Sequence, residues 1–345
     1  MGLFTDRTIK DGKTGLPIWF MRQAGRYHAH YQNIRKSSDF MTMCKTPDLA
    51  TEITMGPINE FDFDAAILFS DLLFPLEQLG LGLSYHTGPP TLTVKLDTLD
   101  KVNGLKKTEE ATPFYQFQGD ALTKIRAELP NNKTLLGFVG APFTLYSYAV
   151  EGSHTGNLTP SKLGFYDGRF EAFMEKLLPE LITNMKIQAK AGADAICLFD
   201  TAVGECGFQD FINYPIKYLK IVTKEFKKDF PNTRLVYYSK LTHMNYLQAI
   251  EDENIDVLGI DWRHDLNNAL NILGKDYYVQ GNLDPSHLFL PWNILRTKWD
   301  ELFSSIENNV NISKSILGLG HGVLQFTPQE NVKNSIQHVH DNFLY

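Results

Sequence analysis

The sequence of 345 residues is poor in cysteine, in long apolar runs and in positive charge. Its three cysteines, Cys44, Cys197 and Cys206, form no CxxC pair and no cysteine–histidine cluster at zinc spacing, which argues against a disulfide framework or a structural metal site. The first ten residues contain no apolar signal region, and no apolar run reaches the roughly 18 residues of a membrane span, so we expect a cytosolic protein. The net charge of −7 gives no broad attraction to nucleic acid or to an anionic membrane.

Because the chain is acidic overall, an anionic substrate must be drawn by a local cluster of cations. The stretch WFMRQAGRY at positions 19–27 offers one, since an apolar run ends at Arg22 and Arg26 follows with Gly25 between them. The planar fork of arginine binds carboxylate or phosphate through two hydrogen bonds and stays charged. Taken alone, the stretch is better explained as a strand followed by a solvated loop.

Eight short apolar runs alternate with segments of helical periodicity. This order predicts an α/β fold with a parallel sheet covered by helices, and eight units predict a single-domain (β/α)8 TIM-type barrel over residues 1–345. A doubly wound open sheet is the alternative, but no GxGxxG follows the first run. The expected strands are Ile18–Met21, Ala65–Phe69, Leu135–Val139, Asp194–Phe199, Arg234–Tyr238, Val257–Ile260, Tyr277–Val279 and Ser315–Leu319.

The spacing between these runs also predicts helices and insertions. The early gaps are long, so we expect insertions in the early loops, at Leu81–Leu99 and Glu151–Gly168, and a surface excursion at Leu99–Thr112. The expected helices are Thr46–Phe61, Phe170–Ala191, Phe211–Lys228, His243–Ile250, Leu266–Leu273, Trp292–Ile306 and Pro328–His340.

In a barrel, residues at the carboxyl ends of the strands converge on one pocket. The pair we weigh most is Asp71 with Arg22, because nearby positive charge is expected to lower the pKa of a carboxylate and keep it ionised. Asp71 also has a structural interpretation as a helix cap, as do Asp261 and Asp284, for which we favour that interpretation.

Two further candidates stand at or beyond strand ends. Tyr148 fits an amphipathic helix with its hydroxyl satisfied as well as it fits a site. His321 lies between Gly320 and Gly322, and the missing side chains on both sides are expected to let another group approach the imidazole closely, which favours function.

Several motifs are distributed over nearly the whole chain. They are FMRQAGRY at 20–27, DAAILFSDLL at 64–73, GFVGAPFTLYSYAVEG at 137–152, LFDT at 198–201, LGIDW at 258–262, QGNLDP at 280–285 and LGHG at 319–322. Together, and in this order, they resemble the uroporphyrinogen decarboxylase family.

The resemblance implies a (β/α)8 barrel that acts as a homodimer without metal or organic cofactor and removes CO2 from the four acetate side chains of uroporphyrinogen III. It implies catalytic roles for Asp71, which would bind the pyrrole NH groups, and for Arg22 and Tyr148. It places the substrate-binding positions at Arg22, Gln23, Ala24, Gly25, Arg26, Arg35, Asp71, Tyr148, Thr201 and His321. Of these, the three arginines and His321 are expected to supply the cations for the substrate's acid groups.

The chain departs from the family pattern at two places. His28-Ala29-His30-Tyr31 stands where the family usually has Leu-Pro-Glu-Tyr, which bears on the rigidity and charge of that loop. Ala202-Val203-Gly204 replaces Trp-Gly-Gly or Ala-Gly, which bears on one wall of the pocket.

Two other functions stay open at this point. A related barrel family contains corrinoid-dependent methyltransferases, which bind zinc through histidine and cysteine, but no cysteine here sits in such a ligand set. A non-catalytic tetrapyrrole-binding protein would need the same cationic clamp. The sequence also leaves open which group acts as the general acid, because arginine is a poor acid at neutral pH.

Overall fold

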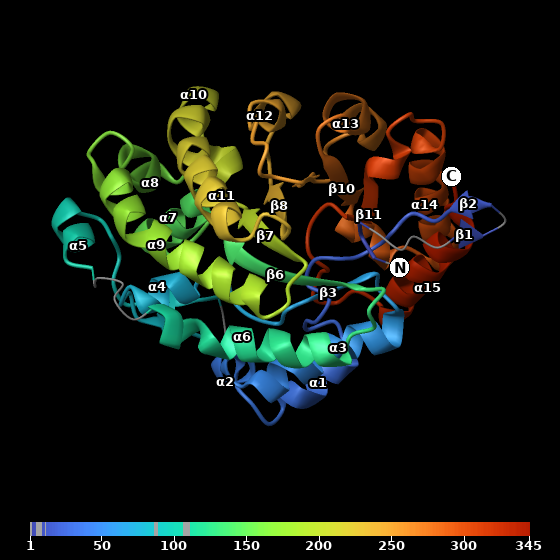
Figure 1. The fold of residues 1–345 in the computed structure, drawn as a ribbon, viewed down its shortest axis with the longest axis horizontal. Coiled ribbons are helices and arrows are strands. Elements are labelled where there is room, and N and C mark those ends of the chain that lie inside the picture. Colours follow the sequence, from blue (N-terminus) through green and yellow to red (C-terminus); the bar gives the residue numbers. More distant parts are fainter. Residues whose placement is uncertain (1, 5–8, 11, 86–88, 106–110) are drawn as a thin grey trace.

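A computed structural model describes residues 2–4, 9–10, 12–85, 89–105 and 111–345. Parts of the first ten residues and of the two expected excursions, at 86–88 and 106–110, therefore lie outside the described residues. The molecule is built on one curled parallel sheet with helices around its outside (Figure 1). In spatial order its strands are β11 (Ser315–Leu319), β10 (Tyr278–Leu283), β9 (Val257–Gly259), β8 (Arg234–Ser239), β7 (Ala195–Asp200), β6 (Thr134–Gly140) and β3 (Ala65–Ile67).

These seven strands confirm seven of the eight expected runs, and the α/β barrel-type fold is confirmed with them. Each connection runs through a helix, as parallel strands require. The strands are almost fully buried because apolar side chains pack on both faces, toward the barrel interior and toward the helices.

The expected strand Ile18–Met21 was wrong as a regular strand, although the segment fills the eighth place. Ile18 makes a single parallel bridge to Leu317 of β11, and on the other side the Asp64 N–H donates to Ile18 O at 3.1 Å. Pro17 has no N–H to give to a ladder, and the Ile18 N–H donates to the Asp64 carboxylate at 2.7 Å instead of to a carbonyl. Side chains thus replace part of the ladder, and the segment lies between β11 and β3.

The outer layer contains most of the expected helices. Helices α13 and α14 begin and end where the periodicity predicts, and α9 differs by one residue at each end. The expected helix Phe211–Lys228 is divided by a π-helical turn at Ile212–Ile216 that contains Pro215, which has no N–H for the regular bond. The main outer helices are α3 (Pro47–Phe61), α6 (Ala111–Glu128), α9 (Arg169–Lys190), α11 (Lys217–Asp229), α13 (Leu266–Leu273), α14 (Trp292–Ile306) and α15 (Gln329–Asn342).

Shorter elements fill the loops. The excursion near Leu99 contains a helical turn, α5, and α6 was not predicted. The short helices are α1 (Ala29–Arg35), α2 (Phe40–Lys45), α4 (Phe74–Gln78), α5 (Leu99–Asn103), α7 (Pro142–Glu151), α8 (Thr159–Leu163), α10 (Phe208–Phe211) and α12 (Met244–Gln248). The remaining strands form two small hairpins, β1 (Ile9–Lys10) with β2 (Lys13–Thr14) and β4 (Leu83–Ser84) with β5 (Thr91–Leu92).

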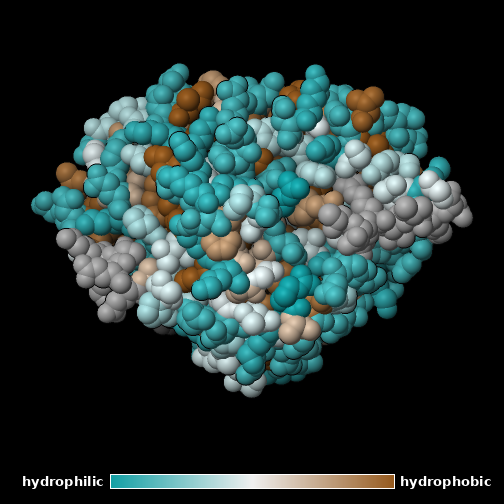
Figure 2. Space-filling model, viewed as in Figure 1, coloured by the Kyte–Doolittle hydropathy of each residue, from teal (hydrophilic) through white to brown (hydrophobic). Residues whose placement is uncertain are grey.

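The end of the chain is tied to its beginning. The Thr14 N–H donates to Tyr345 O and the Tyr345 N–H donates to Thr14 O, both at 3.0 Å, so β2 lies beside the C-terminus (Figure 1). The face shown in Figure 2 is mostly hydrophilic, with apolar residues scattered over it. Within the described residues, no helix combines the length and apolar character of a membrane span.

Candidate active site

A cavity of about 700 Å³ opens at the carboxyl ends of the strands. Its wall receives side chains from residues that follow β3, from β6, β7 and β8, and from the loop after β11. All ten positions that the family resemblance predicts to bind substrate line this one cavity. The fold therefore brings together residues that lie far apart along the chain; their roles are a separate question.

Arg22 stands at the mouth of the cavity in a conformation that other contacts hold. Its φ of 57° is left-handed, which is uncommon for a residue with a side chain. A Cβ atom added to Gly322 would lie 2.6 Å from Arg22 Cδ, so the glycine leaves room for the arginine stem. Likewise, a Cβ on Gly320 would lie 2.3 Å from the Trp262 nitrogen. The glycines beside His321 thus accommodate protein atoms, while the imidazole itself lines the cavity.

The arginines of the cavity differ from the other described arginines. Arg22, Arg26 and Arg35 are exposed and have no carboxylate partner within the described part of the chain. Each of the other arginines in that part forms an ion pair with an aspartate; these are Arg126, Arg169, Arg234, Arg263 and Arg296. Free guanidinium groups that share one cavity are suited to bind anionic groups of a ligand.

The segment between the arginines is anchored to the sheet. The Gln23 side chain is buried, where its amide donates to Ala65 O at 2.6 Å and accepts from the Ile67 N–H at 3.2 Å. These two bonds extend the edge of β3 and hold the backbone of Ala24 and Gly25 against the cavity. The Gln23 side chain therefore holds the backbone of this segment in place, and Ala24 and Gly25 present main-chain atoms to the cavity.

Asp71 lies half-buried in the cavity with both carboxylate oxygens occupied. Oδ1 accepts from the Leu73 N–H at 2.7 Å and Oδ2 accepts from the Tyr85 hydroxyl at 2.6 Å. Burial raises the pKa of Asp71, while these two hydrogen bonds and Arg22 oppose the rise. The expectation of a lowered pKa was wrong, because desolvation outweighs the nearby arginine.

Tyr148 projects from α7 into the cavity and meets a residue that the sequence reasoning missed. Its hydroxyl forms a hydrogen bond with Nδ1 of His154, which also lines the cavity. Burial and the charge of Asp71 raise the pKa of Tyr148 to about 12, so the phenol is protonated at neutral pH. Burial, Lys240 and Arg22 lower the pKa of His154. His154 stands in an insertion and at no strand end, so strand-end logic gave no signal for it.

His321 is a neutral group and not a cation of the rim. Burial, then Arg22, Lys240 and His154, lower the pKa of His321 to about 3. Its Nδ1 lies 3.2 Å from the Tyr238 hydroxyl, which also donates to Gly320 O at 2.7 Å. The expectation that His321 supplies positive charge was therefore wrong, and it offers the cavity a neutral imidazole.

The remaining candidates divide between the cavity and the framework. Thr201 lines the cavity, whereas Asp200 beside it is buried and accepts from the Thr144 hydroxyl at 2.7 Å. Asp284 accepts from the Ser286 N–H at 2.8 Å, and Asp261 accepts from the Leu241 N–H at 2.8 Å. The predicted cap is confirmed for Asp284. For Asp261 it was wrong as a helix cap, because Asp265 caps α13 and Asp261 anchors loop N–H groups instead.

No set of metal ligands accompanies this cavity. Within the described ranges, no group of three or more histidine, cysteine, aspartate or glutamate residues has the arrangement to hold a metal ion. All three cysteines are buried and none lines the cavity. The donor set of a zinc-dependent methyltransferase is therefore not found among these residues.

Residues 9–342 match the family model "Uroporphyrinogen decarboxylase (URO-D)". The uroporphyrinogen decarboxylase of Helicobacter pylori (strain G27) is 36% identical over 343 residues, which cover 98% of each chain. That of Solibacter usitatus (strain Ellin6076) is 35% identical over 94% of this chain and 93% of the relative. This chain belongs to the uroporphyrinogen decarboxylase family. A methyltransferase from Methanosarcina mazei shares the fold, with a TM-score of 0.73 over 95% of this chain and 94% of that one, but only 16% identity.

The two departures from the decarboxylase pattern lie away from the cavity chemistry. His28 is fully buried, its Nε2 lies 2.7 Å from Glu60 Oε2, and its ring centroid lies 5.0 Å from that of Phe61. Burial lowers its pKa, so it adds no charge to the loop at neutral pH. Ala202 and Val203 are buried and do not line the cavity, so their side chains do not reshape its wall.

Proposed function

We propose that this protein removes CO2 from the four acetate side chains of uroporphyrinogen III, giving coproporphyrinogen III in porphyrin and haem synthesis. The observation that carries the proposal is one cavity that holds three arginines without carboxylate partners among the described residues and one half-buried carboxylate, Asp71. A porphyrinogen carries acid groups around a ring of four pyrrole NH donors. Arg22, Arg26 and Arg35 fit the acid groups, and Asp71 fits the NH donors.

The reaction needs a place for the electrons that CO2 leaves behind. Protonation of a pyrrole carbon creates a cationic ring; the bond to the carboxylate then breaks, and its electron pair neutralises the ring as CO2 departs. The exocyclic carbon takes up a proton and becomes a methyl group, and the ring carbon loses the proton it gained. Each acetate thus consumes one proton and releases one CO2.

Asp71 is placed to stabilise the positive charge that develops on the ring. Its charge acts in a half-buried site, where electrostatic interactions are stronger than in water. The Tyr85 and Leu73 hydrogen bonds hold the carboxylate before the substrate arrives, so little reorganisation accompanies the reaction. Aromatic side chains at Phe69, Phe138 and Phe199 supply apolar wall for the pyrrole faces.

We also propose that residues 1–345 form one domain that works as a homodimer in the cytosol, without metal or organic cofactor. Three cavity arginines that form no ion pair with any described residue support a mechanism in which protein groups bind the carboxylates themselves. The family resemblance is the ground for the dimer.

An anaerobic assay tests this function directly, because porphyrinogens are oxidised in air. Purified protein is incubated with uroporphyrinogen III, and products are separated after oxidation to porphyrins. Formation of coproporphyrin through the partly decarboxylated intermediates is the expected result. Tight binding of uroporphyrinogen without CO2 release would instead identify a tetrapyrrole-binding protein, and methyl transfer with stoichiometric zinc would identify a methyltransferase.

A further inference from the structure

The turn after α7 folds the chain back onto Tyr148. Helix α7 ends at Glu151, and Gly152 follows with a left-handed φ of 75°, its N–H donating to Tyr148 O at 2.8 Å. This reversal brings His154, six residues after Tyr148, over the tyrosine ring, with ring centroids 5.0 Å apart. The phenol and Nδ1 of the imidazole are then hydrogen-bonded.

The loop that carries His154 is fixed on both sides. The Glu151 carboxylate accepts from both the N–H and the hydroxyl of Ser161, at 3.1 and 3.0 Å, and Glu151 O accepts from Lys95 Nζ at 2.8 Å. Ser153 and Thr155, on either side of the histidine, bond to each other through their hydroxyls at 3.0 Å. His154 is therefore held against Tyr148 by its surroundings.

Burial and the charges that face the pair keep the imidazole neutral and the phenol protonated. Burial, then Lys240 and Arg22, lower the pKa of His154. Burial, then the charge of Asp71, raise the pKa of Tyr148 to about 12. Two arrangements of the hydrogen bond remain, because either the phenol hydroxyl or an imidazole Nδ1–H can donate. The phenol hydroxyl is the stronger donor and a bare imidazole nitrogen is the stronger acceptor, which favours donation from the Tyr148 hydroxyl to His154 Nδ1, with the imidazole proton on Nε2.

We propose that His154 is a positioning residue for Tyr148, which it holds with the phenolic proton turned away and the oxygen lone pairs presented to the cavity. The proposal rests on the proposed function. In this orientation Tyr148 is a second acceptor beside Asp71, suited to the same NH groups and to the same developing positive charge. Without His154, the hydroxyl is free to rotate and donate to Asp71, which would weaken the charge that the reaction needs.

A double-mutant cycle separates this role from a merely structural one. We expect His154→Ala to lower kcat by about 10-fold with KM changed by less than about twofold, because one hydrogen bond that orients an acceptor is lost. Since the effect passes through Tyr148, His154→Ala should add nothing once Tyr148→Phe is present. Asn157→Ala, a change at an exposed position of the same loop, is the matched control and should leave kcat unchanged. With active wild-type protein, losses from His154→Ala and Tyr148→Phe that multiply would overturn the proposal.

The hydrogen bond can also be observed without turnover. In full-length protein with ¹⁵N-labelled histidine, His154 should show an unprotonated Nδ1 and a protonated Nε2 at neutral pH, and the Nδ1 signal should move in Tyr148→Phe. A proton on Nδ1 would overturn the proposal whether or not the protein is active. Wild-type protein that makes no coproporphyrinogen would instead refute the proposed function, so the two failures are distinguishable.

Discussion

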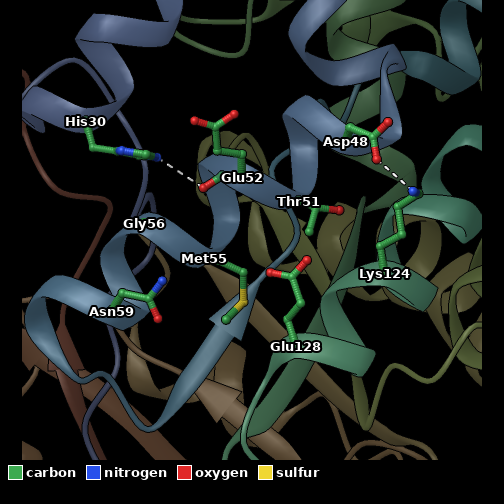
Figure 3. Close-up of a pocket in the computed structure, with 9 residues that line it drawn as sticks. All are labelled: His30, Asp48, Thr51, Glu52, Met55, Gly56, Asn59, Lys124 and Glu128. Atoms are coloured by element: carbon green, nitrogen blue, oxygen red, sulfur yellow. Dashed lines mark hydrogen bonds and ion pairs between the residues drawn. The ribbon is translucent and has the colours of Figure 1, made fainter.

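Two hollows in the described part of the molecule both have charged walls, but their cations are paired differently. The second hollow, of about 360 Å³, lies on the outer helical layer between α3 and α6 (Figure 3). There Lys124 already pairs with Asp48 at 2.6 Å, and His30 Nε2 contacts Glu52 O at 3.2 Å. In the barrel cavity, by contrast, the arginines have no carboxylate partner in the described part of the chain.

The difference lies in where each wall comes from. The outer hollow is formed mainly by two neighbouring helices, and its lysine, Lys124 of α6, pairs with Asp48 of α3 as solvated side chains commonly do. The cavity is formed by the ends of many strands, so its groups are placed by the fold and not by local pairing. Cations without an ion-pair partner therefore indicate a binding site, whereas the presence of charged side chains alone does not.

The largest expected effect on turnover comes from Asp71, the carboxylate of the barrel cavity. Asp71→Asn removes the negative charge but keeps an oxygen for the Leu73 N–H, so the protein should fold while turnover falls by roughly 100- to 1000-fold, as when one preorganised electrostatic group is lost. The measurements are kcat in the anaerobic assay and the thermal unfolding midpoint. Glu52→Gln in the outer hollow is the matched control, and wild-type turnover in Asp71→Asn would refute the assignment.

A smaller loss of kcat/KM should follow when one of the three cavity arginines loses its charge. Arg22→Gln keeps much of the side-chain length but cannot form a charge-assisted pair, so kcat/KM should fall by about 10- to 100-fold, mostly through KM. Initial rates over a range of uroporphyrinogen concentrations measure it. An unchanged KM would show that Arg22 does not hold a substrate carboxylate.

The pH dependence of kcat/KM distinguishes the role of Asp71 from that of His321. Burial raises the pKa of Asp71 above that of an ordinary aspartate, so the active carboxylate is present above this pKa and is lost as the pH falls through it. Well below that pKa, kcat/KM should drop about tenfold per pH unit. Since His321 has a pKa of about 3, it stays neutral across the assay range, and His321→Gln should leave the position of the acid limb unchanged. If the wild-type pH profile of kcat/KM shows an inflection near the ordinary histidine pKa and His321→Gln removes it, the neutral state assigned to His321 is contradicted.

The order of elements was predictable because each buried run and each amphipathic helix is a local signal. Leu266–Leu273 and Trp292–Ile306 were predicted residue for residue, since their apolar faces and flanking turns coincide. Ile18–Met21 was not predictable as an irregular segment, because the Ile18 N–H donates to the side chain of Asp64, which lies far along the chain, instead of to a carbonyl of a neighbouring strand.

The residues that line the site were predictable from the sequence, but the directions of their pKa shifts were not. The sequence places Asp71 near Arg22, yet the sign of the pKa shift depends on how much water the fold removes. For the same reason His321 was expected to carry charge and does not. His154 reaches Tyr148 only because Gly152 reverses the chain after α7, and sequence spacing alone does not show that contact.

The smallest expected effect tests the outer hollow. The Lys124 and Asp48 side chains are about half or more exposed, at 48% and 79%, so water already screens the pair and its loss should change the unfolding midpoint little. Lys124→Gln should also leave kcat/KM within about twofold of the wild-type value, because solvent screens a surface charge outside the cavity. A loss comparable to that of Arg22→Gln would show that the two hollows communicate, and that the position of unpaired charge alone does not locate the site.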